Sequence, residues 1–375
     1  MVVLFGVVMG QMTFTDNWQK RAPARPQWSP LDDPCEPVTA LDRLREIQKL
    51  QRQILLLADE ATHCHDEYRS AAEYILTRWR DDSAKNRPRF VALGSISCYA
   101  NLQGYAMQVL NLAEEPDLVP KCPQKDFMFR RHCALAEFLA ASQYGWALFL
   151  DADIGVVNPL HRLENYTLTE DLHLVFYNRF YNDEVASGSY IVRNSQRGLG
   201  FLHFWANYYQ EHPYFGTDNG AINNVIVEYF HPELYESRQV CEAIWAASKN
   251  YEGLFNYQAC VQEYILSVAA STEYHIYEKG RAWVRDGWLT DNKWSLDDFF
   301  FHGWKRTKIG NEWNFRFTDQ QIFSQPCRKP EDVARWRFVD GATLSDTDKW
   351  NCSAIFARLA EERKPRRRPA NGNTR

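Results

Sequence analysis

The sequence predicts an α/β fold, in which helices cover a sheet and polar chemistry lies at the carboxyl ends of its strands. Segments typical of buried strands alternate with segments typical of helices from residue 89 onward. One apolar strand segment, residues 146–150, ends directly in Asp151 and Asp153, which is where open α/β sheets bind their ligands. The chain has 375 residues, of which 45% are hydrophobic and 24% charged. This is enough for one large domain with a sizeable core.

Four parts are expected along the chain. Residues 1–37 hold an apolar N-terminal end, too short to span a bilayer, and a proline-rich linker; the apolar end would be the remnant of a signal anchor or a floppy end. Residues 38–84 have apolar residues at helical spacing, as in a stem helix that could form a coiled coil and a homodimer, or in a helix packed on the main domain. Residues 85–345 form the main domain, and residues 346–375 a basic, disordered tail.

The elements of the main domain follow from the apolar patterns. Residues 89–100 are expected to be the first strand, ending in a Gly/Ser turn, and residues 101–113 the helix after it. Residues 127–142 are a second predicted helix, before the strand at 146–150. Further strands are predicted within 171–180, 188–195 and 299–301, and a helix within 197–212.

Charge and composition narrow the classes of partner. A net charge of −5 gives no basic footprint for nucleic acid, so no nucleic-acid partner is expected. Aromatic residues make up 14% of the chain, with 13 Trp and 19 Tyr. Such residues usually serve packing, but they also suit a cleft that stacks on sugar rings or bases.

The cysteines and two sequons bear on the cellular compartment. Nine cysteines are scattered without a C-x-x-C pair, which argues against a zinc site of the usual spacing. Their odd number leaves at least one thiol free or paired between chains. Sequons at Asn165 and Asn351 would be glycosylation acceptors in a secretory protein. Together these features favour the secretory pathway.

The two acids after the apolar strand are candidate metal ligands. Asp151 and Asp153 repel each other unless a cation lies between them or solvent covers them. Carboxylate oxygens suit Mg²⁺ or Mn²⁺, and a run of three phenylalanines delivers His302 as a third ligand, followed by Gly303 and Lys305. The alternatives are a strand end with solvated turn aspartates and a structural histidine.

Five segments together resemble a known family. The chain is similar to a nematode family of glycosyltransferases described as a domain of unknown function, itself related to the fungal Golgi family of galactosyl- and mannosyltransferases. The resemblance implies a GT-A fold, a nucleotide-diphospho-sugar transferase fold with a single central mixed sheet flanked by helices. The matching segments are "QKDFMFRRHCALAEFLA", "YGWALFLDADIGVVNP", "YNRFYNDEVASGSYIVRNS", "GTDNGAIN" and "RDGWLTDNKW…FFFHGWK".

The resemblance assigns the metal and the diphosphate to particular residues. Carried over by position, Asp153 and His302 would ligate Mn²⁺ (or Mg²⁺), and Asp151 would contact the metal or the donor ribose. Lys305 would meet the diphosphate, next to Gly303. A metal and a cation would stabilise the negative charge that develops on the departing diphosphate.

Further residues are candidates for the nucleotide. Gly94, Ser95 and Tyr99 end the predicted first strand where the related enzymes hold the base, although Gly94 could simply make a turn. Arg131 or Arg130, on the helix before the acidic motif, could reach the nucleotide, or lie on a solvated helix face.

Two segments are candidates for the sugar. Ser187, Gly188 and Ser189 would permit close approach of the donor sugar, the alternative being a plain strand with a bulge. Asp218 and Asn219 would face the sugar near the reacting carbon; the alternative is that Asp218 only caps a helix.

The predicted function is transfer of a hexose, with retention, from a nucleotide sugar to a glycan or glycoprotein. A UDP-sugar is favoured as donor, and the Golgi lumen as location, with membrane attachment only through an N-terminal anchor. One rival is a haloacid-dehalogenase-type phosphatase with Asp151 as nucleophile, although Gly155 stands where that motif has Thr or Val. The other is a sugar-nucleotide or glycan-binding protein without turnover.

Overall fold

The computed structural model describes most of the main domain and one strand near the N-terminus. The described residues are 3–9, 87–111, 118, 120–166, 171–180, 182–208, 216–234, 236, 239–268, 271–290, 292–304, 327, 331–332 and 336–345. The predicted linker, the helical stem at 38–84, the basic tail at 346–375 and Lys305 lie outside these residues.

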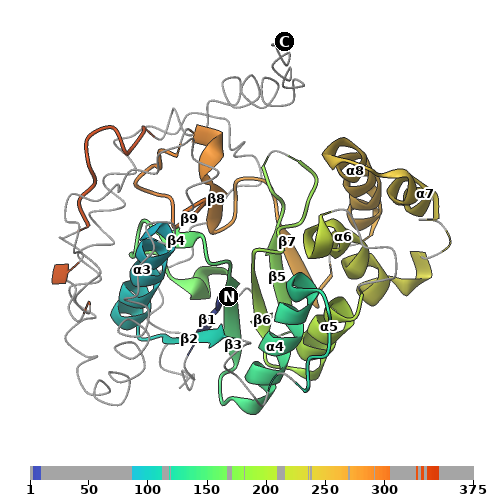
Figure 1. The fold of residues 1–375 in the computed structure, drawn as a ribbon, viewed down its shortest axis with the longest axis horizontal. Coiled ribbons are helices and arrows are strands. Elements are labelled where there is room, and N and C mark those ends of the chain that lie inside the picture. The colour runs from blue at the N-terminus through green and yellow to red at the C-terminus, as the bar shows by residue number, and fades with distance from the viewer. Residues whose placement is uncertain are drawn as a thin grey trace, which may run out of the picture.

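A six-stranded mixed sheet forms the centre of the fold (Figure 1). Its neighbours pair antiparallel except for the last two strands, which run parallel. In order across the sheet, the strands are β2 (Ala106–Asn111), β1 (Val3–Met9), β3 (Trp146–Leu150), β6 (Ser189–Arg193), β5 (Leu174–Tyr177) and β7 (Tyr274–Tyr277).

A smaller sheet of three strands lies beside the first. Its order is β4 (Ile154–Val156), β9 (Phe300–His302) and β8 (Val284–Asp286). Strand β4 pairs antiparallel with β9, and β8 pairs parallel with β9. The described fold is therefore mixed α/β, as predicted, with two sheets.

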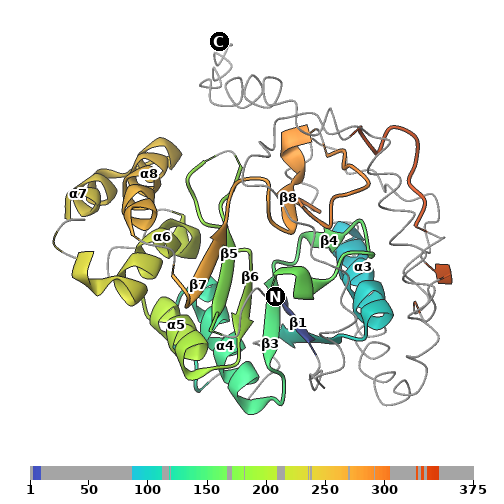
Figure 2. The same cartoon turned by 180° about the vertical axis from the view of Figure 1, so that it is seen from behind.

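Helices cover the two faces of the large sheet unequally (Figures 1 and 2). One face carries most of the helices, and the other carries α3 (Arg87–Gln103) and the small sheet. The helices of the first group are α4 (Phe127–Ala141), α5 (Gln196–Ala206), α6 (Thr217–Phe230), α7 (Gln239–Ala247) and α8 (Tyr251–Ser267). Three short 3₁₀ helices are η1 (Leu163–Tyr166), η2 (Pro232–Leu234) and η3 (Gly287–Thr290).

Alternation along the strands divides the interior into two cores. In β3, Ala147 and Phe149 pack against the α4 side, whereas Leu148 and Leu150 pack against α3 and the small sheet. Successive side chains of a strand point to opposite faces, so a strand covered on both faces becomes a continuous apolar run. The "WALFL" segment of β3 is continuously apolar for this reason. The prediction of a buried strand there is confirmed.

Two neighbouring element predictions were wrong. Residues 89–100 lie in helix α3, and residues 106–111 of the predicted helix at 101–113 form strand β2. Almost every residue from Val91 to Ala100 is buried, and an apolar run covered on all sides has no periodicity that separates helix from strand. The segment expected as a floppy end or an anchor remnant forms strand β1, between β2 and β3.

Three disulfides link described residues: Cys98–Cys327, Cys122–Cys133 and Cys241–Cys260. The first ties α3 to a residue far along the chain, and the third joins α7 to α8. Among the helices that the structure describes, there is none with the length and apolar character needed to cross a membrane.

Candidate metal centre

The acidic motif lies where the chain passes from the large sheet to the small one. Strand β3 ends at Leu150, and a tight turn follows in which Ile154 N donates to Asp151 O at 3.0 Å. Strand β4 then pairs with β9 so that Ile154 lies opposite His302. The backbone N–H groups of Gly303 and Trp304 both donate to Asp153 O at 2.9 Å. The ladder between β4 and β9 therefore brings Asp153 and His302 together across nearly 150 residues of sequence.

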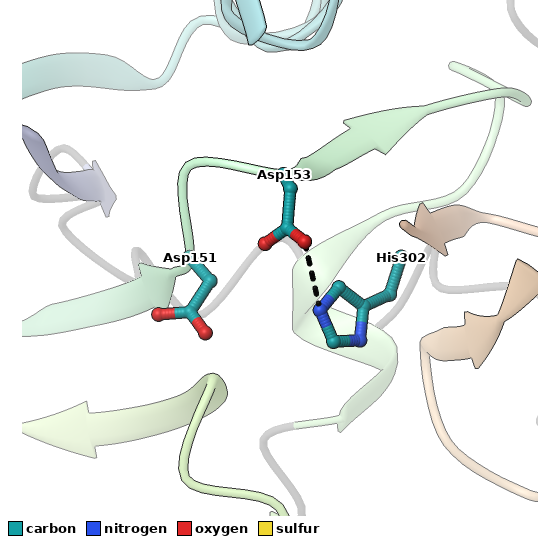
Figure 3. A group of neighbouring side chains, drawn as sticks. All are labelled: Asp151, Asp153 and His302. Atoms are coloured by element: carbon teal, nitrogen blue, oxygen red, sulfur yellow. Dashed lines mark ion pairs between the residues drawn. The ribbon is translucent and has the colours of Figure 1, made fainter. Parts of the chain in front are cut away.

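Asp151, Asp153 and His302 converge as predicted (Figure 3). One ligand atom from each lies within 4.8 Å of the others, and His302 Nε2 is 3.4 Å from Asp153 Oδ2. Ligands about 2.1 Å from a Mg²⁺-like ion in an octahedron lie roughly 3 to 4.2 Å apart. Small side-chain rotations would close the three atoms onto one ion. Two carboxylates and an imidazole form a donor set that suits Mn²⁺, so these residues fit the predicted metal.

The electrostatics of this cluster also suit a cation. Burial alone would lower the pKa of His302, but Asp153 and Asp286 outweigh it and raise that pKa to about 9. Burial raises the pKa of Asp151 above its usual value, and the neighbouring Asp153 adds to this, although Arg131 opposes it. The carboxylates are thus held in a site where a positive charge, from a proton or a metal ion, is favourable.

Arg131 closes the other side of Asp151. Its Nη1 donates to Asp151 Oδ1 at 2.5 Å, and its Nη2 donates to Asp218 Oδ2 at 2.5 Å. The guanidinium is buried, and burial alone would lower its pKa, but the two acids raise that pKa overall. Arg131 was predicted to reach the nucleotide. In the structure it is placed at the site but is directed at Asp151 and Asp218.

Asp218 is fully buried, and both of its oxygens accept hydrogen bonds. Oδ2 accepts from Arg131 and faces His132 Nε2 at 3.0 Å, while Oδ1 accepts from Asn219 N and from the Thr217 hydroxyl. Burial would raise its pKa, but Arg131 and His132 outweigh it and lower that pKa to about 2. In the structure Asp218 is linked to Asp151 through Arg131, and its place near the sugar stays a prediction.

The segment predicted to line the donor sugar lies against the acidic turn. Asp151 N donates to Gly188 O at 2.8 Å, and a Cβ added at Gly188 would lie 2.6 Å from Asp151 Oδ2. A side chain at this position would therefore crowd the Asp151 carboxylate. Ser187 Oγ donates to Asn219 Oδ1 at 2.5 Å, so Ser187, Gly188 and Asn219 are brought to the site, and their contact with a sugar stays a prediction.

The residues predicted to hold the nucleotide base lie in helix α3, and their contact with a base stays a prediction. Gly94, Ser95 and Tyr99 are buried within α3. Ser95 Oγ accepts from Val156 N at 2.9 Å, and Tyr99 OH donates to His161 O at 3.0 Å. The prediction placed these residues at the end of a strand; as part of a helix, Ser95 and Tyr99 support β4 and the loop after it.

Gly303 and an outer set of residues complete the cluster. Gly303 has φ +119°, a backbone conformation that favours glycine, and this lets its N–H reach Asp153 O. The other ring nitrogen of His302, Nδ1, lies 2.8 Å from Asp286 Oδ1, and Arg179 holds Asp286. Neither Asp286 nor Arg179 was among the site residues expected from the sequence. The signal that could have found Asp286 is its position at the end of a strand, as with Asp151.

One comparison with known proteins gives a match. The model of a family described as "Protein of unknown function, DUF273" matches residues 96–316, which is more than half of the chain. No curated protein matches the chain. No solved structure matches it either. The matched span includes Asp151, Asp153 and His302. The chain belongs to the DUF273 family.

Proposed function

We propose that this protein is a metal-dependent glycosyltransferase that moves a hexose from a nucleotide sugar, with a UDP-sugar favoured, to a glycan or glycoprotein acceptor. The observation that carries the proposal is the convergence of Asp151, Asp153 and His302 at the junction of the two sheets. Acids at the carboxyl end of a buried strand, joined by a distant imidazole, form a site for a divalent cation and a diphosphate.

The three residues would hold the ion, and Mn²⁺ is the preferred candidate because an imidazole is among the ligands. When bound, a divalent cation supplies charge stabilisation to the diphosphate as the sugar leaves. The Asp286 and Arg131 contacts fix the two sides of this ligand set before any donor arrives. Such preorganisation reduces the rearrangement needed during the reaction.

The chain's own polar groups near Asp151 would receive the donor sugar. Gly188 leaves the approach to Asp151 free of a side chain, and Ser187 and Asn219 place a hydroxyl and an amide beside it. With Asp218 buried and fully hydrogen-bonded, the described part of this segment offers no free carboxylate as a strong base. This favours a retaining reaction, in which the departing phosphate takes the proton of the acceptor hydroxyl.

An acceptor would fit a hollow that lies beside the cluster. Arg179 and Asp286 line it, together with the aromatic rings of Tyr166, Tyr177 and Trp283. Aromatic faces combined with carboxylates and a guanidinium are a surface that suits a sugar ring.

We further propose a GT-A fold for the described α/β unit and a location in the Golgi lumen. The three disulfides support an oxidising compartment. Asn165, in one of the two sequons, is exposed, which is compatible with glycosylation there.

The proposal is tested by incubating the full chain with a panel of UDP- and GDP-sugars and Mn²⁺ and measuring nucleotide release. We expect release with at least one UDP-sugar, and its loss on adding EDTA or with Asp153→Asn. Release that EDTA and Asp153→Asn leave unchanged would contradict the metal assignment. Mg²⁺-dependent cleavage of a generic phosphate ester, abolished by Asp151→Asn, would instead favour a phosphatase. Binding of UDP and Mn²⁺ without consumption of any donor would favour a binding protein.

A further inference from the structure

We propose that Asp286 and Arg179 are positioning residues that orient the His302 imidazole, so that its Nε2 lone pair faces the metal centre. The inference rests on the proposed function, because it concerns the same metal site. It assigns a role to an acid and an arginine that lie outside the three ligands.

The imidazole lies between two carboxylates, one on each ring nitrogen. Nε2 faces Asp153 Oδ2 at 3.4 Å, and Nδ1 faces Asp286 Oδ1 at 2.8 Å. The second contact is a hydrogen bond of ordinary length, whereas the first is longer than an N–H···O hydrogen bond. The strong, short contact is therefore on the side away from the predicted ion. Strand pairing builds it, because β8 and β9 run parallel with Asp286 opposite His302.

Arg179 determines what Asp286 can do. Its Nη2 and Nε donate to the two oxygens of Asp286 at 2.9 Å and 3.2 Å, and its Nη1 donates to Glu184 at 2.8 Å. A carboxylate in a two-pronged pair with a guanidinium stays ionised and can only accept hydrogen bonds. The neutral imidazole must then carry its proton on Nδ1, which leaves the lone pair of Nε2 for a metal ion.

Trp288 adds a steric restraint on the same ring. Its indole lies 5.2 Å from the imidazole, at 66° to it, and the Arg179 guanidinium lies 5.2 Å from the Trp288 ring. Arg179 thus holds both the acid and the indole that contact His302. Metal-binding histidines typically depend on such an outer partner, whose loss lowers metal affinity by about 10- to 100-fold.

The first test is on the unmodified protein and needs no variant. With ¹⁵N-labelled histidine and the His302 signal assigned by its absence in His302→Gln, NMR at a pH above 9 shows which nitrogen carries the proton. We expect Nδ1–H. A proton on Nε2 would overturn the proposal.

The second test uses Asp286→Asn and follows Mn²⁺ by electron paramagnetic resonance. Asp286 Oδ1 accepts from Arg179 Nη2 and faces His302 Nδ1, while Oδ2 accepts from Arg179 Nε, so an amide must turn its NH₂ toward Arg179 or toward Nδ1 and cannot keep this arrangement. We expect Mn²⁺ affinity to fall by about 10-fold or more, with loss of the ¹⁴N coupling of the imidazole to bound Mn²⁺. The variant also removes a negative charge near the ion, which weakens cation binding by itself, so Asp286→Glu, which keeps that charge, is compared with it.

Asp298→Asn is the matched control. Asp298 is also a buried acid held by an arginine, since Arg285 Nε donates to both of its oxygens at 2.9 Å, and it lies just before β9. We expect this variant to keep Mn²⁺ affinity and ¹⁴N coupling, and Asp286→Glu to recover part of both.

The outcomes separate this inference from the proposed function. If Asp286→Asn is folded and binds Mn²⁺ with wild-type affinity and coupling, or if Asp298→Asn loses as much, the positioning role is wrong and the transferase proposal is untouched. If the wild-type protein behaves as expected here but releases nucleotide from no donor, the transferase proposal fails while the positioning role stands. A wild-type protein that binds no Mn²⁺ would overturn both.

Discussion

Two buried histidines on opposite sides of Asp151 behave in opposite ways. Both imidazoles lie beside carboxylates, His132 next to Asp218 and His302 between Asp153 and Asp286. Yet burial, helped by the neighbouring Arg131, lowers the pKa of His132 to about 4, although Asp218 opposes the shift. The pKa of His302 is raised to about 9 because its two acids outweigh burial.

The difference lies in where the arginines stand. Arg131 is bonded to the same carboxylate as His132, so its positive charge already neutralises Asp218. Near His302, Arg179 contacts Asp286, whereas Asp153 faces the imidazole directly. The His132 side is therefore a neutralised structural network, stacked on Trp205, while the His302 side keeps negative charge for a cation. Burial next to an acid does not by itself identify a metal-binding histidine.

Removing the arginine from the neutralised side should have the largest effect. Arg131→Met leaves the buried Asp218 and the partly exposed Asp151 without their cation, and we expect a loss of about 3–5 kcal/mol in the free energy of unfolding, measured by denaturant titration of the metal-free protein. Arg197→Met is the control, because the ion pair of Arg197 with Glu273 is more than a third exposed; it should cost at most about 1 kcal/mol. An Arg131→Met protein as stable as the Arg197→Met control would contradict the claim that Arg131 neutralises these two acids.

The two histidines should give stability opposite dependences on pH. The folded pKa of His132, about 4, lies below its unfolded value near 6.5, so its contribution is complete above pH 6.5 and is lost as the pH falls toward 4. The folded pKa of His302, about 9, lies above that value; its contribution is complete below pH 6.5 and is lost as the pH rises toward 9. Each contribution is on the order of 3 kcal/mol.

Denaturant titrations of the metal-free protein from pH 4 to pH 9 measure these slopes. His132→Gln should make the free energy of unfolding less dependent on pH on the acidic side, above the range where carboxylates titrate. His302→Gln should do the same on the alkaline side. If the two variants changed the pH dependence equally on the acidic and the alkaline side, the assignment of one side to each histidine would be contradicted.

The same pair of variants should separate metal binding from stability. His302→Gln removes a ligand, and we expect Mn²⁺ affinity to fall by at least about 10-fold. His132→Gln should leave Mn²⁺ affinity within a factor of about two and instead cost about 1–3 kcal/mol, because it disturbs buried hydrogen bonds to Asp218 and Tyr190. Isothermal titration with Mn²⁺ compares them. A similar loss of Mn²⁺ affinity in both variants would mean that the hydrogen-bond networks of His132 and His302 are coupled.

The contact between Gly188 and Asp151 offers the finest test. Gly188→Ala would place a methyl group 2.6 Å from Asp151 Oδ2 and push this ligand out of position, at a stability cost of about 1–3 kcal/mol. We expect Mn²⁺ affinity to fall several-fold, to a smaller extent than with His302→Gln. Gly145→Ala is the control, because a Cβ there meets no atom within 4 Å. Unchanged affinity in Gly188→Ala would show that Asp151 is not held close to this segment in the metal-bound protein.

Some parts of the site were predictable from the sequence because the chain shows them locally. The "WALFL" run followed at once by Asp151 and Asp153 shows a buried strand end, and the phenylalanines before His302 show another. Placing polar ligands at strand ends is a general property of α/β sheets, so their convergence could be expected. The helices at α4 and α5 were also predicted from their apolar patterns, and in the structure Asp126 and Ser195 cap them.

Other parts could not be found, because they depend on tertiary contacts. The segment of Ser95 and Tyr99 is buried almost throughout, so helix and strand could not be told apart from its sequence. Nothing local shows that Arg131 bridges Asp151 and Asp218, or that Asp218 is wholly buried. The link from Arg179 to Asp286 joins residues 107 positions apart, and only the fold shows that it reaches His302.

Mn²⁺ binding to the wild-type chain and to Asp153→Asn tests the central claim most directly. Electron paramagnetic resonance measures the fraction of bound ion and its coupling to imidazole nitrogen. The account predicts one Mn²⁺ per chain with ¹⁴N coupling that disappears in His302→Gln, and an affinity that falls by at least about 10-fold in Asp153→Asn. An Asp153→Asn protein that binds Mn²⁺ as tightly as wild type, with the same coupling, would contradict it.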